Sequence, residues 1–151
     1  MKQVLIAGCG DLGSELARRL QARGWQVTGL RRNPEGLPDG VQGLAADLCA
    51  PECPPDWPAR IDYLVYCPAA GRRDAELYQR LYVQGLQHVL DWMAAHRQRP
   101  RLLLQVSSTG VYAQHQGEWD SDNSAALADS DTSRALLSAE DVALRSGHPA
   151  T

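Results

Sequence analysis

The chain has 151 residues, of which 44% are hydrophobic and 22% are charged, and its formal net charge at pH 7 is −3. This composition is ordinary for one soluble globular domain, and it argues against a disordered chain and against a surface for nucleic acid or anionic membranes. Residues 1–3 are followed by only four apolar residues before the first glycine. We therefore expect neither a secretory signal nor a membrane span there, and we expect a cytoplasmic location.

The four cysteines are Cys9, Cys49, Cys53 and Cys67. No Cys or His partners accompany them at zinc-site spacing, so we expect no metal site. In a cytoplasmic protein the thiols are expected to be reduced. Cys9 falls inside a glycine-rich segment, where we interpret it as a small residue that fits a tight turn.

The motif that organises the sequence begins directly after an apolar run at residues 4–7. Gly8, Gly10 and Gly13 form a G-x-G-x-x-G pattern, and an amphipathic helix pattern follows at once. In such a unit the first glycine permits the turn, the second leaves room for a pyrophosphate, and the third lets the helix approach the strand. The first amides and the dipole of the helix attract phosphate. The predicted dinucleotide loop comprises Gly8, Gly10, Asp11, Leu12 and Gly13.

A second predicted strand, at residues 26–30, ends in Arg31, Arg32 and Asn33. A site selective for NAD usually has an acidic residue there, which accepts a hydrogen bond from the ribose 2′-hydroxyl. Arginine instead suits the 2′-phosphate of NADP, because its planar fork of donors matches phosphate oxygens. Arg31 and Arg32 therefore favour NADP over NAD, unless they are only solvated loop charges.

Two more predicted strands, at 41–48 and 61–67, end in residues that suit a cofactor. Asp47 could accept a hydrogen bond from the adenine amino group, but capping of the next turn is an equally good interpretation. The segment 49–60 contains four prolines, which exclude a regular helix. The predicted cofactor contacts from these strand ends are Asp47, Leu48, Pro68, Ala69 and Ala70, the last three being small enough for close approach.

The remaining pattern predicts an α/β fold. Residues 33–40 are too rich in helix breakers for a full helix, while 74–96 should form a long amphipathic helix, 101–106 a fifth strand and 131–140 another helix. Buried strands separated by helices or long crossovers give a doubly wound parallel sheet, the Rossmann fold. Ligands of such sheets bind at the carboxyl ends of the strands.

Four segments, 8–13, 47–48, 68–70 and 107–112, together resemble the extended short-chain dehydrogenase/reductase family, in its NAD(P)-dependent epimerase/dehydratase group. The resemblance covers nearly the whole chain. Its most specific part is the S-S-x-x-V-Y sequence at 107–112. By this resemblance, Ser108 would hydrogen-bond the reacting hydroxyl or carbonyl group of the substrate.

The chain departs from that family where the family has a Tyr-x-x-x-Lys pair. The resemblance places Thr132 at the tyrosine and Leu136 at the lysine, and neither side chain can replace the proton transfer or the ribose contact. Tyr112 and Tyr82 are the candidate replacement acids, although an unassisted phenol is a poor acid or base at neutral pH.

The resemblance also implies that relatives continue into a sixth strand and a substrate-binding lobe. Residues 1–151 then correspond to an NAD(P)-binding domain that stops before the sixth strand. We expect an exposed sheet edge at the fifth strand. Relatives often pair through their long helices, which implies a homodimer.

Two functions are consistent with these features. The first is an oxidoreductase or epimerase/dehydratase that prefers NADP and acts on a sugar or nucleotide-sugar type of small molecule, with Ser108 and Tyr112 as its catalytic candidates. The second is a non-catalytic NAD(P)-binding sensor or regulator, which needs only the glycine loop and the arginines. Neither function involves nucleic acid or a membrane.

Overall fold

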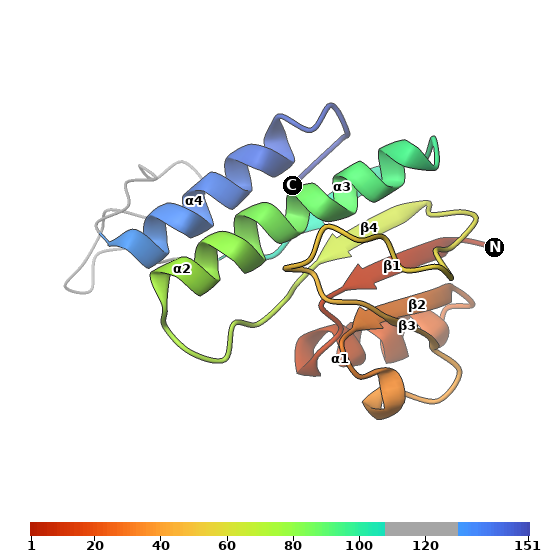
Figure 1. Ribbon diagram of the computed structural model, residues 1–151. Coiled ribbons are helices and arrows are strands. Elements are labelled where there is room, and N and C mark those ends of the chain that lie inside the picture. Colours follow the sequence, from red (N-terminus) through yellow and green to blue (C-terminus); the bar gives the residue numbers. More distant parts are fainter. Residues whose placement is uncertain (108–129) are drawn as a thin grey trace, which may run out of the picture.

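The computed structural model describes residues 1–107 and 130–151, and its centre is a five-stranded sheet (Figure 1). The strand order is β3-β2-β1-β4-β5, and every neighbouring pair is parallel. The strands are β1 Gln3–Ala7, β2 Gln26–Arg31, β3 Gln42–Ala45, β4 Tyr63–Tyr66 and β5 Leu102–Gln105. The predicted doubly wound parallel sheet is confirmed, and its order reverses between β1 and β4, the place where this fold binds ligands.

Helices cover both faces of the sheet. They are α1 Asp11–Gln21, the 3₁₀ turn η1 Pro34–Gly36, α2 Ala75–Tyr78, the π-helical turn η2 Gln79–Gln84, α3 Gly85–Ala95 and α4 Asp131–Leu144. In Figure 1, α1 lies below the sheet, and α2, α3 and α4 lie on the opposite side. Within the described residues, none of these helices is long and apolar enough to cross a membrane.

β1 shows why both faces must be covered. Val4 and Ile6 pack in one cluster with Ala17 of α1. Leu5 and Ala7 belong to the other cluster, which includes residues of α3. Successive side chains of a strand point to opposite faces, so a strand that is apolar at every position is buried on both.

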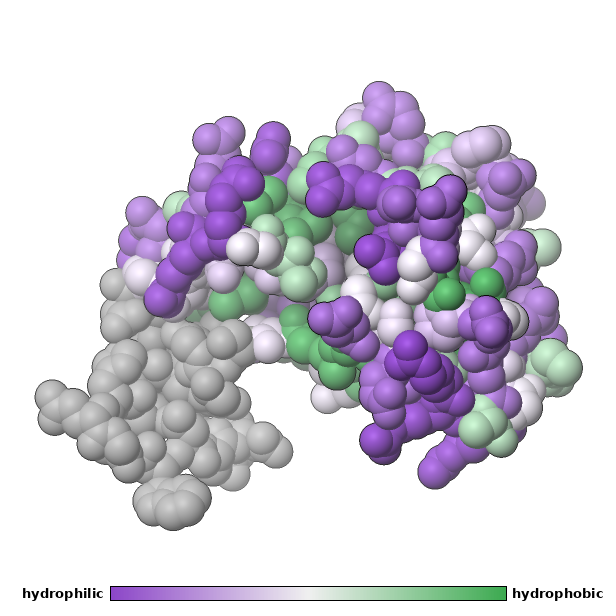
Figure 2. Space-filling model, turned by 90° about the horizontal axis from the view of Figure 1, so that it is seen from below, coloured by the Kyte–Doolittle hydropathy of each residue, from purple (hydrophilic) through white to green (hydrophobic). Residues whose placement is uncertain are grey.

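The outer face of α1 is charged. Arg18 and Arg19 both pair with Glu15, and all three side chains are more than half exposed. Seen from below, the side that α1 covers, the surface is mostly hydrophilic (Figure 2). This face is therefore suited to solvent, while the apolar side of α1 packs on the sheet.

The predicted long helix at 74–96 is present, but it is not regular. Between α2 and α3 it widens into the π turn η2. The hydroxyl of Tyr66, a fully buried β4 residue, donates a hydrogen bond to the Leu81 carbonyl inside this turn. A Cβ on Gly85 would overlap that hydroxyl. The π turn and the glycine at position 85 thus leave room for the Tyr66 side chain, which projects from the sheet into the helix.

The expectation of an exposed edge at the fifth strand is wrong. Leu103 donates its main-chain N–H to Pro149 O at 2.8 Å, and Thr151 donates its own to Leu103 O at 2.9 Å. Gln105 N donates to Thr151 O at 2.9 Å, and Leu103 and Ala150 form a parallel bridge. The end of the chain therefore satisfies main-chain groups that would otherwise be unpaired along β5.

The connections around β3 are short and turn-like. Segment 33–40 contains only η1, whose Asn33 cap accepts a hydrogen bond from Glu35 N at 3.1 Å, and no helix occurs in 49–60, as predicted. β3 is shorter than the predicted 41–48 because the chain turns at Asp47, whose carbonyl accepts from Ala50 N at 3.1 Å.

Candidate functional site

The glycine loop is tied to the carboxyl end of β2. The main-chain N–H groups of Gly8 and Cys9 both donate to Leu30 O, each at 3.0 Å. Arg31 follows Leu30 directly. This pairing therefore brings the loop and the arginines to the same edge of the sheet, as the sequence predicts.

The glycines of the motif have three different local roles. Gly8 has φ +83°, and a Cβ on it would overlap the main chain of Pro68. A Cβ on Gly13 would lie 3.0 Å from Ile6 Cγ2, which reflects the predicted close packing of α1 on β1. A Cβ on Gly10 would meet nothing within 4 Å. Gly8 and Gly13 are needed by the fold itself, whereas Gly10 borders open space.

That open space lies in front of the first turn of α1. Gly10 is the N-cap residue, and no side chain caps the helix. Asp11 and Leu12 are exposed, and 60% of Leu12 is accessible to solvent. The first amides of a helix have no partners within it, so an uncapped, accessible N-terminus behind a residue without a Cβ fits a pyrophosphate group.

Arg31 and Arg32 lie at the end of β2, where the sequence places them. Arg31 is half-buried and Arg32 is exposed. The Arg31 guanidinium lies against η1, since a Cβ on Gly36 would be 3.4 Å from one of its terminal nitrogens. Arg31 is therefore held in place by packing, while Arg32 extends into solvent.

A third arginine that sequence reasoning missed approaches the same edge. Burial and the nearby Asp47 carboxylate raise the pKa of the Cys49 thiol, while Arg80 and Arg32 act on it in the opposite sense. Both guanidiniums therefore act electrostatically on Cys49. Arg80 comes from η2, so only the tertiary fold brings its charge to this part of the sheet edge.

Asp47 caps the turn that follows β3, which was the alternative to a contact with adenine. Its Oδ1 accepts a hydrogen bond from Cys49 N at 2.9 Å. The side chain of Leu48 is only 6% exposed and belongs to the core. The Leu48 carbonyl accepts a hydrogen bond from His88 Nδ1 at 2.7 Å. Leu48 could therefore approach a cofactor only through its main chain.

The loop at 68–70 touches both the glycine loop and the long helix. Pro68 packs against Gly8. Ala70 N donates to the hydroxyl of Tyr82 at 3.2 Å. Burial raises the pKa of Tyr82, only partly offset by the Ala70 hydrogen bond. Tyr82 is thus poorly suited to be the replacement acid, and well placed to hold the loop.

Thr132 and Leu136 lie on α4 and are only 8% and 9% exposed. Arg73, from the loop before α2, donates its Nε–H to Thr132 Oγ1 at 3.4 Å. Ser130 caps α4 and has its hydroxyl 3.2 Å from that of Thr132. A cationic guanidinium and hydroxyl groups therefore meet at the position that the resemblance assigns to tyrosine. No local sequence pattern indicates this contact of Arg73.

Ser108 and Tyr112, the predicted catalytic residues, lie outside the described residues 1–107 and 130–151. Ser107 is described, and its hydroxyl oxygen is buried. No hydrogen-bond partner reaches it from the described part of the chain. Such a buried polar atom beside the carboxyl edge is suited to a ligand contact.

All four cysteines are free. Cys9 is fully buried, and its sulfur would lie 3.3 Å from a Cβ on Gly13. Burial raises its pKa, and burial raises the pKa of Cys67 to about 12. The interpretation of Cys9 as a small residue in a tight turn is confirmed.

Comparison with known proteins agrees with this geometry. The model of the NAD dependent epimerase/dehydratase family matches residues 4–142. Protein YeeZ of Escherichia coli K12 is 36% identical in an alignment 123 residues long, which covers 78% of this chain and 44% of YeeZ. The chain therefore spans about half the length of the relatives that it matches.

Solved structures give the same picture. A Methylobacillus flagellatus structure described as an NAD-dependent epimerase/dehydratase is 40% identical, with a TM-score of 0.77, covering 99% of this chain and 52% of that one. The UDP-glucose 4-epimerase of Thermus thermophilus, in complex with NAD, is 20% identical, with a TM-score of 0.79, covering 98% and 53%. The second likeness shows the shared fold. The predicted resemblance is confirmed: this chain belongs to the NAD dependent epimerase/dehydratase family.

Proposed function

We propose that this chain is the cofactor-binding part of an NAD(P)-dependent oxidoreductase or epimerase/dehydratase, and that it prefers NADP. The observation that carries the proposal is the open space in front of Gly10, at an uncapped helix N-terminus. A pyrophosphate needs both close approach and main-chain donors. The family name and the NAD complex of the Thermus relative agree with a nicotinamide dinucleotide.

The described residues suggest how the cofactor would be held. Amides at Asp11 and Leu12 would bind the pyrophosphate. Asp47 and the main chain of Leu48 would meet the adenine. The loop at 68–70, fixed by Tyr82, would border the nicotinamide half. When bound, a nicotinamide dinucleotide supplies hydride transfer.

NADP is preferred in this proposal because of the charge at the end of β2. Arg31 and Arg32 stand where an NAD site usually has a carboxylate, and Arg80 approaches from the long helix. Several guanidiniums can share the charge of a 2′-phosphate, which NAD lacks.

The proposed substrate is a sugar or nucleotide-sugar type of small molecule. The Thermus relative is a UDP-glucose 4-epimerase, and we extend only that class of substrate to this chain. Ser108 would position the reacting oxygen, with Tyr112 nearby. Because relatives are about twice as long, much of the substrate pocket would come from outside these residues.

A non-catalytic NAD(P)-binding role is the second candidate. Thr132 and Leu136 favour it, since neither can take part in the proton transfer expected of Tyr and Lys. Arg73, which donates a hydrogen bond to Thr132, brings a positive charge to this position. A guanidinium does not lose its proton at neutral pH, so it cannot act there as an acid or a base.

Calorimetric titration with NADPH and NADH tests the cofactor proposal. We expect NADPH to bind more tightly, and the double variant Arg31→Ala/Arg32→Ala to lose at least tenfold of the NADPH affinity, about 1.4 kcal/mol or more. NADH affinity should change little. Arg19→Ala/Arg145→Ala, which removes two exposed arginines from α1 and from the C-terminal end of α4, is the charge-matched control.

Three results would contradict parts of the proposal. Equal binding of both nucleotides would remove the NADP preference. An equal loss of NADPH affinity in the control variant would mean that the loss reflects the net charge of the protein and not these two arginines. No binding of either nucleotide to the folded chain would reject this chain as a cofactor-binding unit by itself. To separate enzyme from sensor, the chain loaded with NADP⁺ would be exposed to a panel of UDP-sugars. Appearance of reduced-nicotinamide absorbance, as a sugar hydroxyl is oxidised to a ketone and its hydride passes to the nicotinamide, would favour the enzyme.

A further inference from the structure

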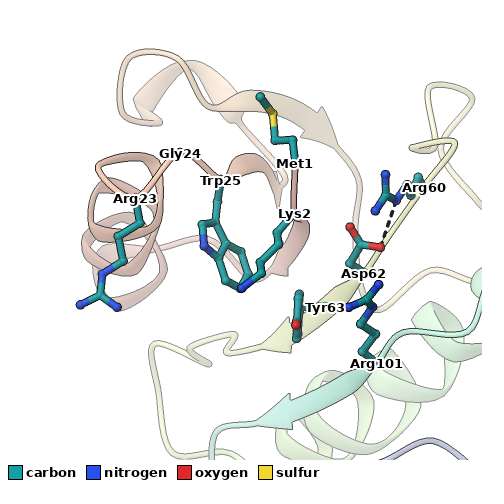
Figure 3. A pocket seen from close by; sticks show the side chains of 9 residues that line it. All are labelled: Met1, Lys2, Arg23, Gly24, Trp25, Arg60, Asp62, Tyr63 and Arg101. Carbon is teal, nitrogen blue, oxygen red and sulfur yellow. Dashed lines mark hydrogen bonds and ion pairs between the residues drawn. The ribbon is translucent and has the colours of Figure 1, made fainter.

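A cavity lies at the opposite end of the sheet from the glycine loop, where the strands begin (Figure 3). Its volume is about 430 Å³. Lys2 precedes β1, Trp25 precedes β2, and Tyr63 begins β4. Because parallel strands all start at one edge, the cavity and the proposed cofactor site lie at opposite ends of the sheet.

The cavity is strongly positive. Four cationic side chains line it, namely Lys2, Arg23, Arg60 and Arg101, against the single carboxylate of Asp62. The chain as a whole has a net charge of −3. The local charge is therefore opposite in sign to that of the protein, which indicates an attractive potential for anions at this place.

The carboxylate of Asp62 already has hydrogen-bond partners within the protein. Asp62 Oδ2 accepts a hydrogen bond from Gln3 N at 2.9 Å, and Oδ1 accepts one from Arg60 Nε at 3.0 Å. Within residues 1–107 and 130–151, Lys2, Arg23 and Arg101 form no ion pair. Asp62 thus neutralises chiefly Arg60, and most of the positive charge remains for a ligand.

The main chain that carries these side chains is fixed. Gln26 N donates to Lys2 O at 2.9 Å, and Arg101 N donates to Asp62 O at 2.7 Å. These bonds join residues at the beginning of neighbouring strands or directly before them. A frame of this kind holds the main chain of Lys2 and Arg101 in place, which reduces the main-chain entropy lost on binding.

The wall of the cavity is aromatic. The rings of Trp25 and Tyr63 are 4.9 Å apart, and Lys2 Nζ lies 5.1 Å from the centre of the Trp25 ring. Figure 3 shows the Lys2 side chain running along Trp25, with Arg60 and Arg101 on either side of Asp62. An aromatic wall offers few acceptors that would compete with an anion for the cations.

We propose that this cavity binds the di- or triphosphate group of a small phosphorylated molecule, at a site separate from the dinucleotide loop. Several cations spread around one cavity match a ligand that carries several neighbouring negative charges. The arginine forks suit phosphate oxygens in particular. The inference does not depend on the proposed cofactor, because the two sites share no residue.

Titration with inorganic tripolyphosphate, followed by NMR, tests it. The indole N–H signal of Trp25, assigned through Trp25→Phe, reports on this cavity alone. We expect saturable shifts of that signal, and dissociation constants at least about tenfold higher for Lys2→Gln/Arg101→Gln, because two of the attracting charges are lost. The control Arg19→Gln/Arg145→Gln removes the same charge from exposed helix surfaces and should bind normally.

Titrations with ATP and with adenosine distinguish a nucleotide ligand from a free polyphosphate. ATP should shift the same signal and adenosine should not; tighter binding of ATP than of tripolyphosphate would identify a nucleotide. Arg60→Gln gives a second test if the double variant is unfolded, and it should weaken binding about threefold. The proposal is overturned if the control weakens binding equally, if the Trp25 signal does not move, or if Arg31→Ala/Arg32→Ala abolishes its shift.

Discussion

The hydroxyl oxygen of Tyr82 accepts a hydrogen bond at 3.2 Å from the main-chain N–H of Ala70. Tyr82 belongs to the π turn η2, and Ala70 belongs to the loop that follows β4. The same π turn receives the hydroxyl of the buried Tyr66 at the Leu81 carbonyl. One widened helical turn therefore connects the sheet interior to the loop that we propose beside the nicotinamide.

Replacement of Tyr82 by Phe should loosen that loop. It leaves the Ala70 N–H without this acceptor, which should lower the free energy of unfolding by about 1 kcal/mol. Hydrogen exchange at Ala70 should become about fivefold faster, measured by NMR. Tyr78→Phe is the matched control, because its ring packs on Tyr82 at 4.9 Å but forms no hydrogen bond to Ala70. Unchanged exchange in Tyr82→Phe would show that the bond does not hold the loop.

Two glycines of one motif should respond differently to alanine. Gly8→Ala should destabilise the fold by about 2–4 kcal/mol, because the new Cβ overlaps Pro68 at a positive φ. Gly10→Ala should cost less than about 1 kcal/mol of stability, since its Cβ meets open space. Nucleotide affinity should nevertheless fall at least about tenfold in Gly10→Ala, because that Cβ stands where the pyrophosphate approaches.

Urea unfolding and calorimetric titration measure these two effects separately. If Gly10→Ala bound nucleotide as the original chain does, the open space in front of α1 would not be the pyrophosphate site. If Gly8→Ala were fully stable, the close contact with Pro68 would relax at little cost.

Gly85 and Tyr66 should be energetically coupled. Gly85→Ala should destabilise the protein by about 2–4 kcal/mol, because its methyl group overlaps the Tyr66 hydroxyl. In a Tyr66→Phe background that hydroxyl is gone, so the same substitution should cost at least about 1 kcal/mol less. A double-mutant cycle by urea denaturation gives the coupling energy. Strictly additive effects would mean that the glycine is required for another reason, such as the 3.2 Å approach to Leu48 O.

The buried thiol of Cys67 should make the fold sensitive to alkali. Its pKa in the fold is about 12, against 9.0 for an unperturbed thiol, because burial disfavours the thiolate. Below pH 9 the thiol is neutral in both states, so no stability is lost. As the pH rises from 9 towards 12, only the unfolded chain ionises readily, and stability falls by up to about 4 kcal/mol.

Cys67→Ala should remove this dependence and flatten the curve of unfolding free energy against pH by about 1.4 kcal/mol per pH unit in that range. Cys53→Ala is the control, because Cys53 is only half-buried and should contribute less. Urea unfolding at a series of pH values gives the curves. Equal slopes for Cys67→Ala and the original chain would show that another group, such as the buried Tyr66, dominates the alkaline loss.

Much of the fold could be predicted from local sequence. The apolar run at 4–7 and the three glycines after it have direct physical consequences, and burial on both faces of β1 and the packing at Gly13 follow from them. Proline spacing excluded a helix at 49–60. Such patterns act over a few residues, so the sequence reveals them without knowledge of the partners.

Contacts between distant residues could not be read in this way. The sequence determined that parallel strands end in a glycine loop, in Arg31 and Arg32, and in the loop at 68–70. Only the tertiary structure decided that Arg73 meets Thr132, that Arg80 approaches Cys49, and that the end of the chain pairs with β5. The periodicity of a helix predicts its buried face but not a π turn, because that turn arises from the hydroxyl of a tyrosine on another element. Side-chain packing between elements, which no local pattern records, decides such features.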